Sequence, residues 1–417
     1  MLDEMSLCGP RARGCADMMC TMDRGLGDEI VGNGECMDEL RQLAEAEREL
    51  REEYARLLSN SGDTSTSETP TWDMIEAAIA DRTRQAPLSM IKDGVVEADE
   101  GRDQAPQLPL RVMVFGGYDD VASGGMVTGC EEMRLTHDAR GSEWSLVKGI
   151  DLNRGAASAV CMQGMCYLVG GFDGSRVLQD ASVHMMNTQG GRARVETLPG
   201  KMSVPRLSCG GVALGTRILV IGGTDGRHVH NSVDCFDTST NEWVSMTNRS
   251  LNVARAACGV VSVGGKAYAV GGYGESGAPL ATAEVYDEKE GRWEMLPGSL
   301  SDARMDCGLC AIGHLLVVVG GRGEGGGLLG SCEVYDLNRG GGWIKAAGRL
   351  NVPRAGMGTV SVGGRVLAIA GSDGRGLLNS WEEYDVASDV WRLLPSKLLR
   401  SRGACSAVLE GSVVLGA

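Results

Sequence analysis

From Arg111 onward the apolar positions form short runs that end at turns, and this pattern predicts strands. Leu315–Val319 is a continuous apolar run that leads directly into two glycines. Such a run is typical of a strand that is buried on both faces and ended by a tight turn. A second run, Gly259–Val263, is joined to the next strand by Gly264 and Gly265, which predicts a hairpin. Two further strands follow in each unit, so each unit is predicted to be a four-stranded antiparallel blade.

Four marks recur in the same order along these units: a lone arginine, a glycine pair, a Tyr-Asp pair and a tryptophan. The glycine pairs are 49 to 54 residues apart. A repeat of this length with these marks predicts a β-propeller. Units one to three depart from the Tyr-Asp mark, with His137-Asp138, Met186-Asn187 and Phe236-Asp237 in its place, and the sixth glycine pair reads Gly371-Ser372. The residues predicted to be structural are Gly116, Gly117, Gly170, Gly171, Gly222, Gly223, Gly271, Gly272, Gly320, Gly321, Gly371, Trp144, Trp243, Trp293, Trp343 and Trp391.

The two ends of the repeat region predict how the ring closes. The first unit begins with a second strand, Leu110–Phe115, and the stretch Arg402–Leu409 has the pattern of a first strand. If the C-terminal strand completes the first blade, the propeller has six blades and no open sheet edge. The alternative is that Val413–Gly416 begins a seventh repeat.

Over residues 111–417, about three quarters of the chain, these marks resemble the propeller of the kelch-like proteins. The resemblance implies a module that binds acidic peptide motifs of protein partners on the face that carries the repeat arginine. Many members also carry an N-terminal BTB–BACK region that recruits a cullin ubiquitin ligase, and residues 1–110 show no such pattern. A substrate-receptor adaptor whose recruiting domain is absent from this sequence is therefore the alternative function. A galactose-oxidase-like or sugar-active propeller enzyme is a third.

Residues 1–110 have a different character and are predicted to form an acidic arm, largely disordered and preceding the propeller at 111–417. The arm holds 24 acidic against 11 basic residues, and the propeller holds 31 against 29. Apolar residues at helical spacing predict short helices at 36–58 and 70–82. Three leucines seven residues apart in 36–58 are compatible with a coiled coil and weak self-association.

Composition narrows the class of function. No domain is basic enough for nucleic-acid binding, and no apolar run is long enough to cross a membrane. The N-terminus does not have the pattern of a signal peptide, and the 14 cysteines lack metal-ligand spacing, so we expect a cytoplasmic protein without metal or cofactor. With five histidines and no Ser/His/Asp grouping, we expect no enzymatic activity and no catalytic residues.

Antiparallel pairing places the fourth-to-first loops and the second-to-third loops on one face. The former hold 13 basic and 3 acidic residues and the latter 4 and 8, a net charge of about +6 that predicts a basic binding face. The repeat arginines, however, recur in every unit, which is also typical of an architectural residue. Cysteines that recur three residues after four of these arginines are expected to pack in the core. The predicted partner-binding residues are Arg154, Arg206, Arg255, Arg304, Arg354, Arg402, Arg176, Arg227, Arg322 and Arg375.

Overall fold

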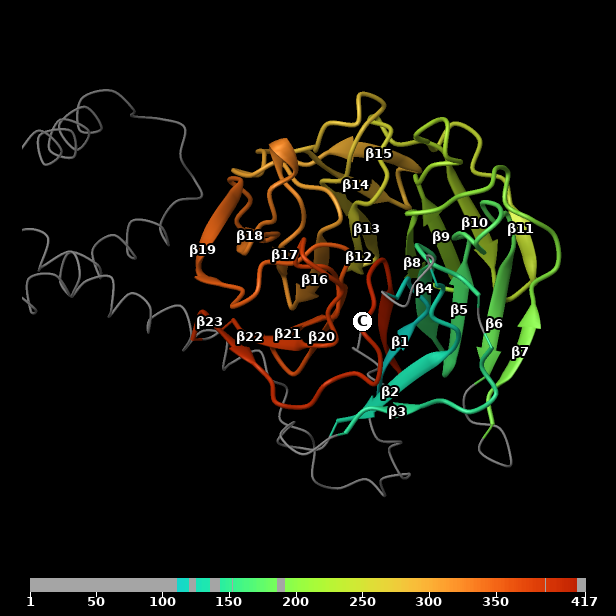
Figure 1. Ribbon diagram of the computed structural model, residues 1–417. Coiled ribbons are helices and arrows are strands. Elements are labelled where there is room, and N and C mark those ends of the chain that lie inside the picture. Colours follow the sequence, from blue (N-terminus) through green and yellow to red (C-terminus); the bar gives the residue numbers. More distant parts are fainter. Residues whose placement is uncertain are drawn as a thin grey trace, which may run out of the picture. The chain divides into compact units, whose positions relative to one another are not determined.

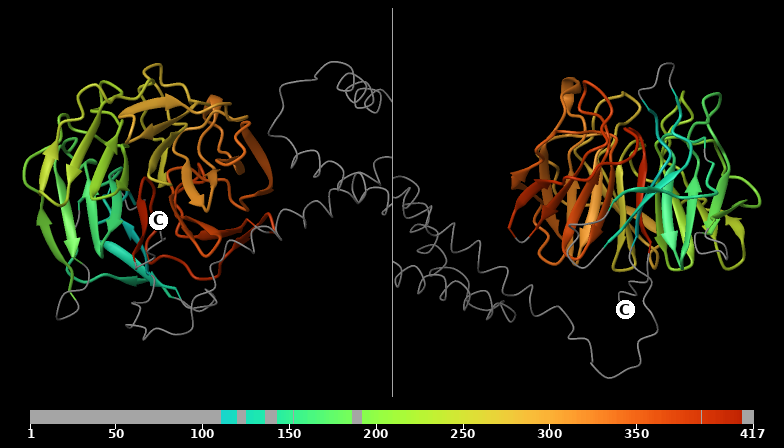
Figure 2. Two further views of the ribbon diagram at one scale, coloured as in Figure 1. Left: turned by 180° about the vertical axis from the view of Figure 1, so that it is seen from behind. Right: turned by 60° about the horizontal axis from the view of Figure 1, so that its bottom comes forward.

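The protein is a six-bladed β-propeller. The structure, a computed structural model, describes residues 111–119, 125–135, 143–151, 153–185, 192–386 and 388–410. They form six four-stranded antiparallel sheets arranged around a central axis, as Figures 1 and 2 show. The predicted all-β, six-bladed fold is confirmed. The predicted helices at 36–58 and 70–82 and the boundary at residue 110 lie outside the described residues.

Each blade is a simple meander of four strands. The first blade contains β1 (Arg111–Phe115), β2 (Cys130–Arg134), β3 (Ser145–Leu146) and β24 (Ser406–Glu410). The second and third contain β4 (Ser158–Met162), β5 (Met165–Val169), β6 (Ala181–Met185), β7 (Arg194–Thr197), β8 (Gly210–Leu214), β9 (Arg217–Ile221), β10 (Val233–Asp237) and β11 (Glu242–Val244). The fourth and fifth contain β12 (Gly259–Val263), β13 (Lys266–Val270), β14 (Ala283–Asp287), β15 (Arg292–Met295), β16 (Gly308–Ile312), β17 (Leu315–Val319), β18 (Ser331–Asp336) and β19 (Trp343–Arg349). The sixth contains β20 (Gly358–Val362), β21 (Arg365–Ile369), β22 (Trp381–Asp385) and β23 (Val390–Leu393).

Helical structure is nearly absent from this region. The 3-10 turn η2 (Glu324–Gly326) lies in the loop between β17 and β18. In the part of the chain that the structure describes, no helix has the length and apolar character that a membrane span requires.

The ring closes through the C-terminal strand. β24 pairs with β1 in antiparallel register from Arg111–Glu410 to Phe115–Ser406. The innermost strand of the first blade therefore comes from the far end of the described chain, and this confirms the predicted closure. As a result β1 has a partner on both sides.

The hydrophobic core is divided among the six interfaces between neighbouring blades. In β17, four of five residues are buried, as the continuous apolar run predicted. Each buried cluster combines side chains from two adjacent blades; one, for example, unites Leu219 and Ile221 of β9 with Ala267 and Ala269 of β13. A single blade could not bury both of its faces, so the closed ring is the unit of stability.

The Tyr-Asp and Trp marks meet across the third and fourth strands. Tyr286 pairs with Trp293 in register, with their ring centroids 5.4 Å apart. The equivalent rings are 5.4 Å apart in the fifth blade and 5.0 Å apart in the sixth. The two aromatic marks thus stabilise the outer edge of these three blades.

The glycine pairs join neighbouring blades. In the fourth blade Gly271 has a φ of 64°, and a Cβ there would lie 2.6 Å from the carbonyl oxygen of Arg304 in the next blade. The amide of Gly272 donates a 2.8 Å hydrogen bond to that same carbonyl. A side chain at the first position would block this close approach, which explains the repeated glycine.

The sixth glycine pair was assigned one residue too late. Gly371, with a φ of 94°, donates to the carbonyl of Arg402 and is therefore the second member of its pair. The first member is Ala370, which takes a φ of 60°. The sequence alignment on Gly371-Ser372 was wrong because it required a glycine where this blade has an alanine.

A closed ring of hydrogen bonds surrounds the axis where the innermost strands begin. In each blade one residue, two positions after the repeat arginine, donates its amide to the carbonyl of the equivalent residue in the preceding blade, at 2.8 or 2.9 Å. All six have a φ between 49° and 62°. They are Ala156, Ser208, Ala257, Asp306, Gly356 and Ala404. The ring links all six blades directly.

The first two blades depart from the repeat differently from the sequence prediction. Strand register places His184-Met185 of β6, not Met186-Asn187, opposite the same positions as Tyr286-Asp287. In the first blade Met133-Arg134 of β2 occupies these positions. Neither pair resembles Tyr-Asp, so the sequence mark does not reveal the register of these two blades.

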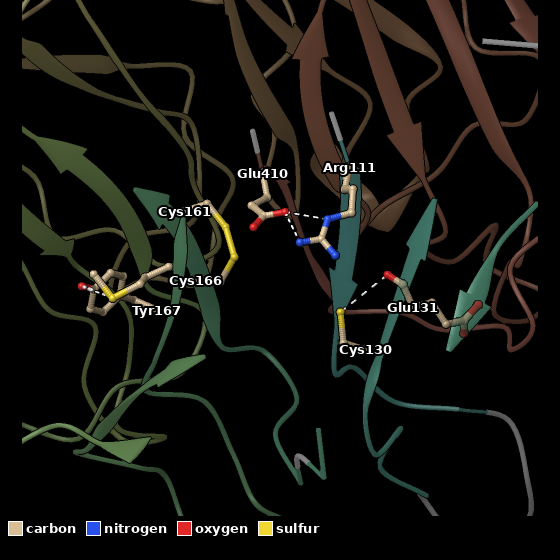
Figure 3. The surroundings of a disulfide bond; sticks show 8 residues. Arg111, Cys130, Glu131, Cys161, Cys166, Tyr167 and Glu410 are labelled. Atoms are coloured by element: carbon tan, nitrogen blue, oxygen red, sulfur yellow. Dashed lines mark hydrogen bonds and ion pairs between the residues drawn. A yellow bond between two sulfur atoms is a disulfide. The ribbon is translucent and has the colours of Figure 1, made fainter. Parts of the chain in front are cut away.

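A disulfide joins the two inner strands of the second blade. Cys161 of β4 and Cys166 of β5 are register partners across a two-residue turn and form this bond (Figure 3). Near them, Arg111 binds Glu410 across the β1–β24 closure, with Nη2 and Oε2 2.6 Å apart.

We predict that deleting residues 403–417 abolishes cooperative folding, because β24 is lost and β1 is left with an open edge. Domains of this kind are stable by only ~5–15 kcal/mol, so loss of a whole innermost strand removes most of that margin. Thermal melting followed by circular dichroism measures the effect. Deletion of 411–417 alone is the control and should leave the midpoint unchanged; equal melting of the two truncated proteins would contradict the closure argument.

Buried His184 makes the second blade sensitive to acid. Its side chain lies against Phe115, and burial lowers its pKa from 6.5 to about 4. The folded state therefore binds fewer protons than the unfolded state between these values, so stability is full above pH 6.5 and is lost as the pH falls toward 4. At about pH 5 the expected loss is about 2 kcal/mol.

Replacing His184 with Phe, the residue at the equivalent position of β10, removes this titration. We expect the urea midpoints of His184→Phe and the original protein to diverge as the pH falls from 7.5 to about 5. A difference that does not change with pH would show that His184 does not bear on acid stability.

Candidate functional site

The candidate site is the mouth face, which we define as the face formed by the fourth-to-first and second-to-third loops. Isolated backbone bridges join the two kinds of loop within each blade, for example Gly155 with Phe172 and Met305 with Arg322. The hydrogen-bonded ring lies at the centre of this face. The loops are therefore held by the same framework that closes the propeller.

Five of the six repeat arginines are not available to a partner on this face. Arg206, Arg255, Arg304, Arg354 and Arg402 are 0% or 1% exposed. Arg255 shows the shared arrangement: its guanidinium donates 2.8 Å and 3.1 Å hydrogen bonds to the carbonyls of Gly271 and Thr282, and a 2.7 Å bond to the carboxylate of Glu284. These arginines are architectural, and the proposal that they contact a partner is not carried forward.

The carboxylates that bind these arginines come from the third strand of each blade. They are Asp234, Glu284, Glu333, Glu382 and Glu131. In the second blade Ser182 stands at this position, and the slightly exposed Arg154 binds Asp180 instead, at 2.5 Å. The predicted charge of about +6 included the five buried arginines. Without them the mouth face is close to neutral.

Three loop arginines do project from the mouth face. Arg176, Arg227 and Arg375 are exposed, and each lies in a turn that begins with Asp-Gly. In the third blade Asp225 Oδ1 accepts hydrogen bonds from the amides of Arg227 and His228, at 2.8 Å and 2.7 Å. These bonds lower the pKa of Asp225 to about 2, so the carboxylate that closes the turn stays ionised in mild acid as well as at neutral pH.

The same device recurs in two other blades. Asp173 Oδ1 accepts from the amides of Ser175 and Arg176, at 2.8 Å and 2.9 Å, and Asp373 Oδ1 accepts from those of Arg375 and Gly376, also at 2.8 Å and 2.9 Å. The bonds to Asp173, first of all that from the Ser175 hydroxyl, hold its pKa well below the usual range, and the amide of Arg375 has the same effect on Asp373. The turns therefore present their arginines on rigid backbones.

Residues just after the glycine pairs form an inner circle around the ring. Three are aromatic: Tyr118, Phe172 and Tyr273. The Tyr273 side chain of the fourth blade lies near Asp306. Burial raises the pKa of Tyr273, and the negative charge of Asp306 adds to this rise. Arg322, which the sequence analysis predicted, is partly exposed here and has its Nε 3.9 Å from Oδ2 of Asp306. The sequence analysis missed Asp306 and the aromatic side chains.

Below the ring lies a cavity of about 180 Å³ between the innermost strands. Its lining is made of small residues, with Cys209, Cys258, Cys307 and Cys405 among them. Burial raises the pKa of the Cys258 thiol to about 12 and that of Cys209 to about 11. Neutral thiols of this kind are unreactive packing groups, which agrees with the expected core role.

Across the described ranges, no three His, Cys, Asp or Glu side chains lie close enough together to hold a metal ion. The close histidine pair, His228 and His230, lies near Asp225, with His228 Nδ1 3.5 Å from its carboxylate.

Comparison with known proteins agrees with the geometry. The profile of the KLHDC2/KLHL20/DRC7 Kelch-repeats domain matches residues 107–272, and the Kelch motif matches 254–299 and 353–398. The chain is a kelch-repeat β-propeller protein. No curated protein sequence matches it.

A solved structure titled "Structure of YjhT" is similar to this kelch-repeat protein in fold. The TM-score is 0.52 and the sequence identity 15%, over 61% of this chain and 86% of that chain. At this sequence identity, the similarity shows a shared fold and no more.

We predict that Arg255→Ala destabilises the protein by ~3–5 kcal/mol, because the variant leaves the Glu284 carboxylate buried without its cation. Arg292→Ala is the matched control: its side chain is 61% exposed and binds surface glutamates, so the loss should stay within ~1 kcal/mol. Urea unfolding measures both. If the two variants unfold at the same midpoint, the architectural role of the repeat arginine is wrong.

Proposed function

We propose that this propeller binds a protein partner across its mouth face and that the exposed loop arginines contact acidic groups of that partner. The observation that carries the proposal is that Arg176, Arg227 and Arg375 project from three similar turns on one face. A kelch propeller fits an interaction module in general. The acidic partner and the choice of face are our own inference.

Rigid presentation supports this function. Each of the three arginines follows an aspartate whose carboxylate closes the turn, so little backbone entropy is lost when a partner is bound. The Arg176 side chain is 75% exposed, although its Nε lies 3.4 Å from Oδ2 of Asp173. A partner carboxylate can therefore still reach its guanidinium group. Planar guanidinium groups suit bidentate contacts with carboxylates.

The differences between blades also support it. Blades two, three and six present an arginine from the Asp-Gly turn, whereas the corresponding loops of blades four and five carry Glu275 and Glu324. A partner would therefore meet arginines on only part of the circle. An uneven distribution of this kind selects one orientation of a partner on the binding face, whereas an identical repeat in every blade does not.

We predict that the triple variant Arg176→Ala, Arg227→Ala, Arg375→Ala loses its partner while remaining folded. A hydrogen bond to a charged group is worth ~1.5–3 kcal/mol, so the loss of even one such contact weakens binding roughly tenfold or more. The full-length chain should be used as bait in quantitative affinity purification, and the recovered partner should then be titrated against the purified variants.

The matched control replaces three arginines of the outer strands, Arg194, Arg292 and Arg392, with alanine. All three are exposed, so this variant carries the same change in charge away from the mouth face. If both triple variants lose the partner equally, the effect is one of net charge and the proposed face is wrong. If neither loses it, the loop arginines do not contribute to binding.

A further inference from the structure

One of the six equivalent ring positions differs in chemistry from the others. At the hydrogen-bonded ring, five blades carry only Ala156, Ser208, Ala257, Gly356 and Ala404, and the fifth blade carries Asp306. The backbone bonds of the ring are the same at all six positions. The Asp306 carboxylate is therefore not needed to build the ring.

The position across from it differs as well. The residues after the glycine pairs are aromatic, hydroxylated or, in the fifth blade alone, the charged Arg322. An acid and a base thus occur together in one blade of an otherwise neutral inner circle. Charged groups that break a structural repeat are better explained by recognition than by architecture.

We propose that Asp306 is a specificity-determining acceptor at the mouth of the central cavity and that it pairs with a guanidinium or ammonium group of the protein partner. This inference rests on the proposed function, because it names a group that the partner supplies. The partner would thus carry a basic group that contacts Asp306 at the centre of the interface, in addition to the acidic groups that contact the loop arginines.

The Asp306 carboxylate has unused capacity to accept hydrogen bonds. Its 3.9 Å separation from the Arg322 Nε exceeds hydrogen-bonding distance. Among the described residues, its side chain makes no hydrogen bond. Burial raises the pKa of Asp306 and the charge of Arg322 lowers it, with burial the larger effect. The ion pair therefore does not fully offset the desolvation of the carboxylate.

The surroundings favour a cation over an anion. Of the described residues that line the cavity, Asp306 is the one with a charged side chain, since the neighbouring thiols are neutral and Arg322 is not part of the lining. The Asp306 side chain is 38% exposed, so an incoming group can reach it. Tyr273 lies within electrostatic range of the carboxylate, and aromatic rings attract cations.

Substitutions at Asp306 can be made without straining the backbone. Its φ is 53°, in the left-handed region that asparagine tolerates well. Alanine is also compatible, because Ala257 and Ala404 have φ values of 52° and 49° at equivalent positions. Asp306→Asn and Asp306→Ala should therefore both fold.

The test uses two small probes with the full-length chain: Nα-acetyl-arginine amide and Nα-acetyl-glutamate amide. Ligand-observed NMR titrations measure their affinity at millimolar concentrations. We expect the arginine probe to bind the original protein and to lose at least about tenfold in affinity with both Asp306 variants, since a charge-assisted hydrogen bond is removed. Asp151→Asn, at an exposed loop position, is the control and should bind normally.

Three results would overturn the inference: no binding of the arginine probe to the original protein, equal binding to all variants, or binding of the glutamate probe that depends on Arg322. Partner capture separates this failure from that of the proposed function. If Asp306→Asn retains the partner that the triple loop variant loses, the loop site stands and the cation contact is wrong. If the triple loop variant retains the partner, the proposed function fails whatever the probes show.

Discussion

A buried arginine in five of the six blades is the interaction on which the rest of this propeller depends. Its guanidinium satisfies the third-strand carboxylate and the carbonyl at the end of the second strand, while its own carbonyl accepts a hydrogen bond from the blade before it. A charge that is removed from water must have all of these partners in place at once. The arginine, the glycine pair and the third-strand acid are therefore parts of a single joint, which explains why they recur together along the chain.

Because the repeated residues serve closure, recognition is left to residues that do not repeat. The hydrogen-bonded backbone of the ring is the same in every blade, so a partner that contacted only this backbone could bind in six equivalent orientations. In the proposed function, Asp306, Arg322 and the uneven set of loop arginines would remove this ambiguity. The proposal therefore assigns recognition to the positions at which single blades depart from the repeat.

The sequence was sufficient to predict the fold, since the blade period, the apolar runs and the two incomplete ends required only local patterns. It was less reliable for single positions. Ala370 takes a left-handed conformation that the search reserved for glycine, and His184 stands where an aromatic-acid pair was sought. A count of charges placed the repeat arginines on the surface because it could not show that Glu284 and its equivalents enclose them. The proximity of Asp306 and Arg322 depends on two loops meeting, which no spacing along the chain reports.

The register of the closing strand shows how little the ring depends on where the chain begins. Glu410 and Arg111 face each other just as Met162 and Met165 do at the tight turn between β4 and β5. A short peptide link between Glu410 and Arg111 would therefore complete a sixth inner hairpin, and the chain could be opened at one of the other five without breaking a hydrogen bond of the ring. The fold is therefore compatible with circular permutation, because the position of the chain ends does not change how the blades pair around the ring.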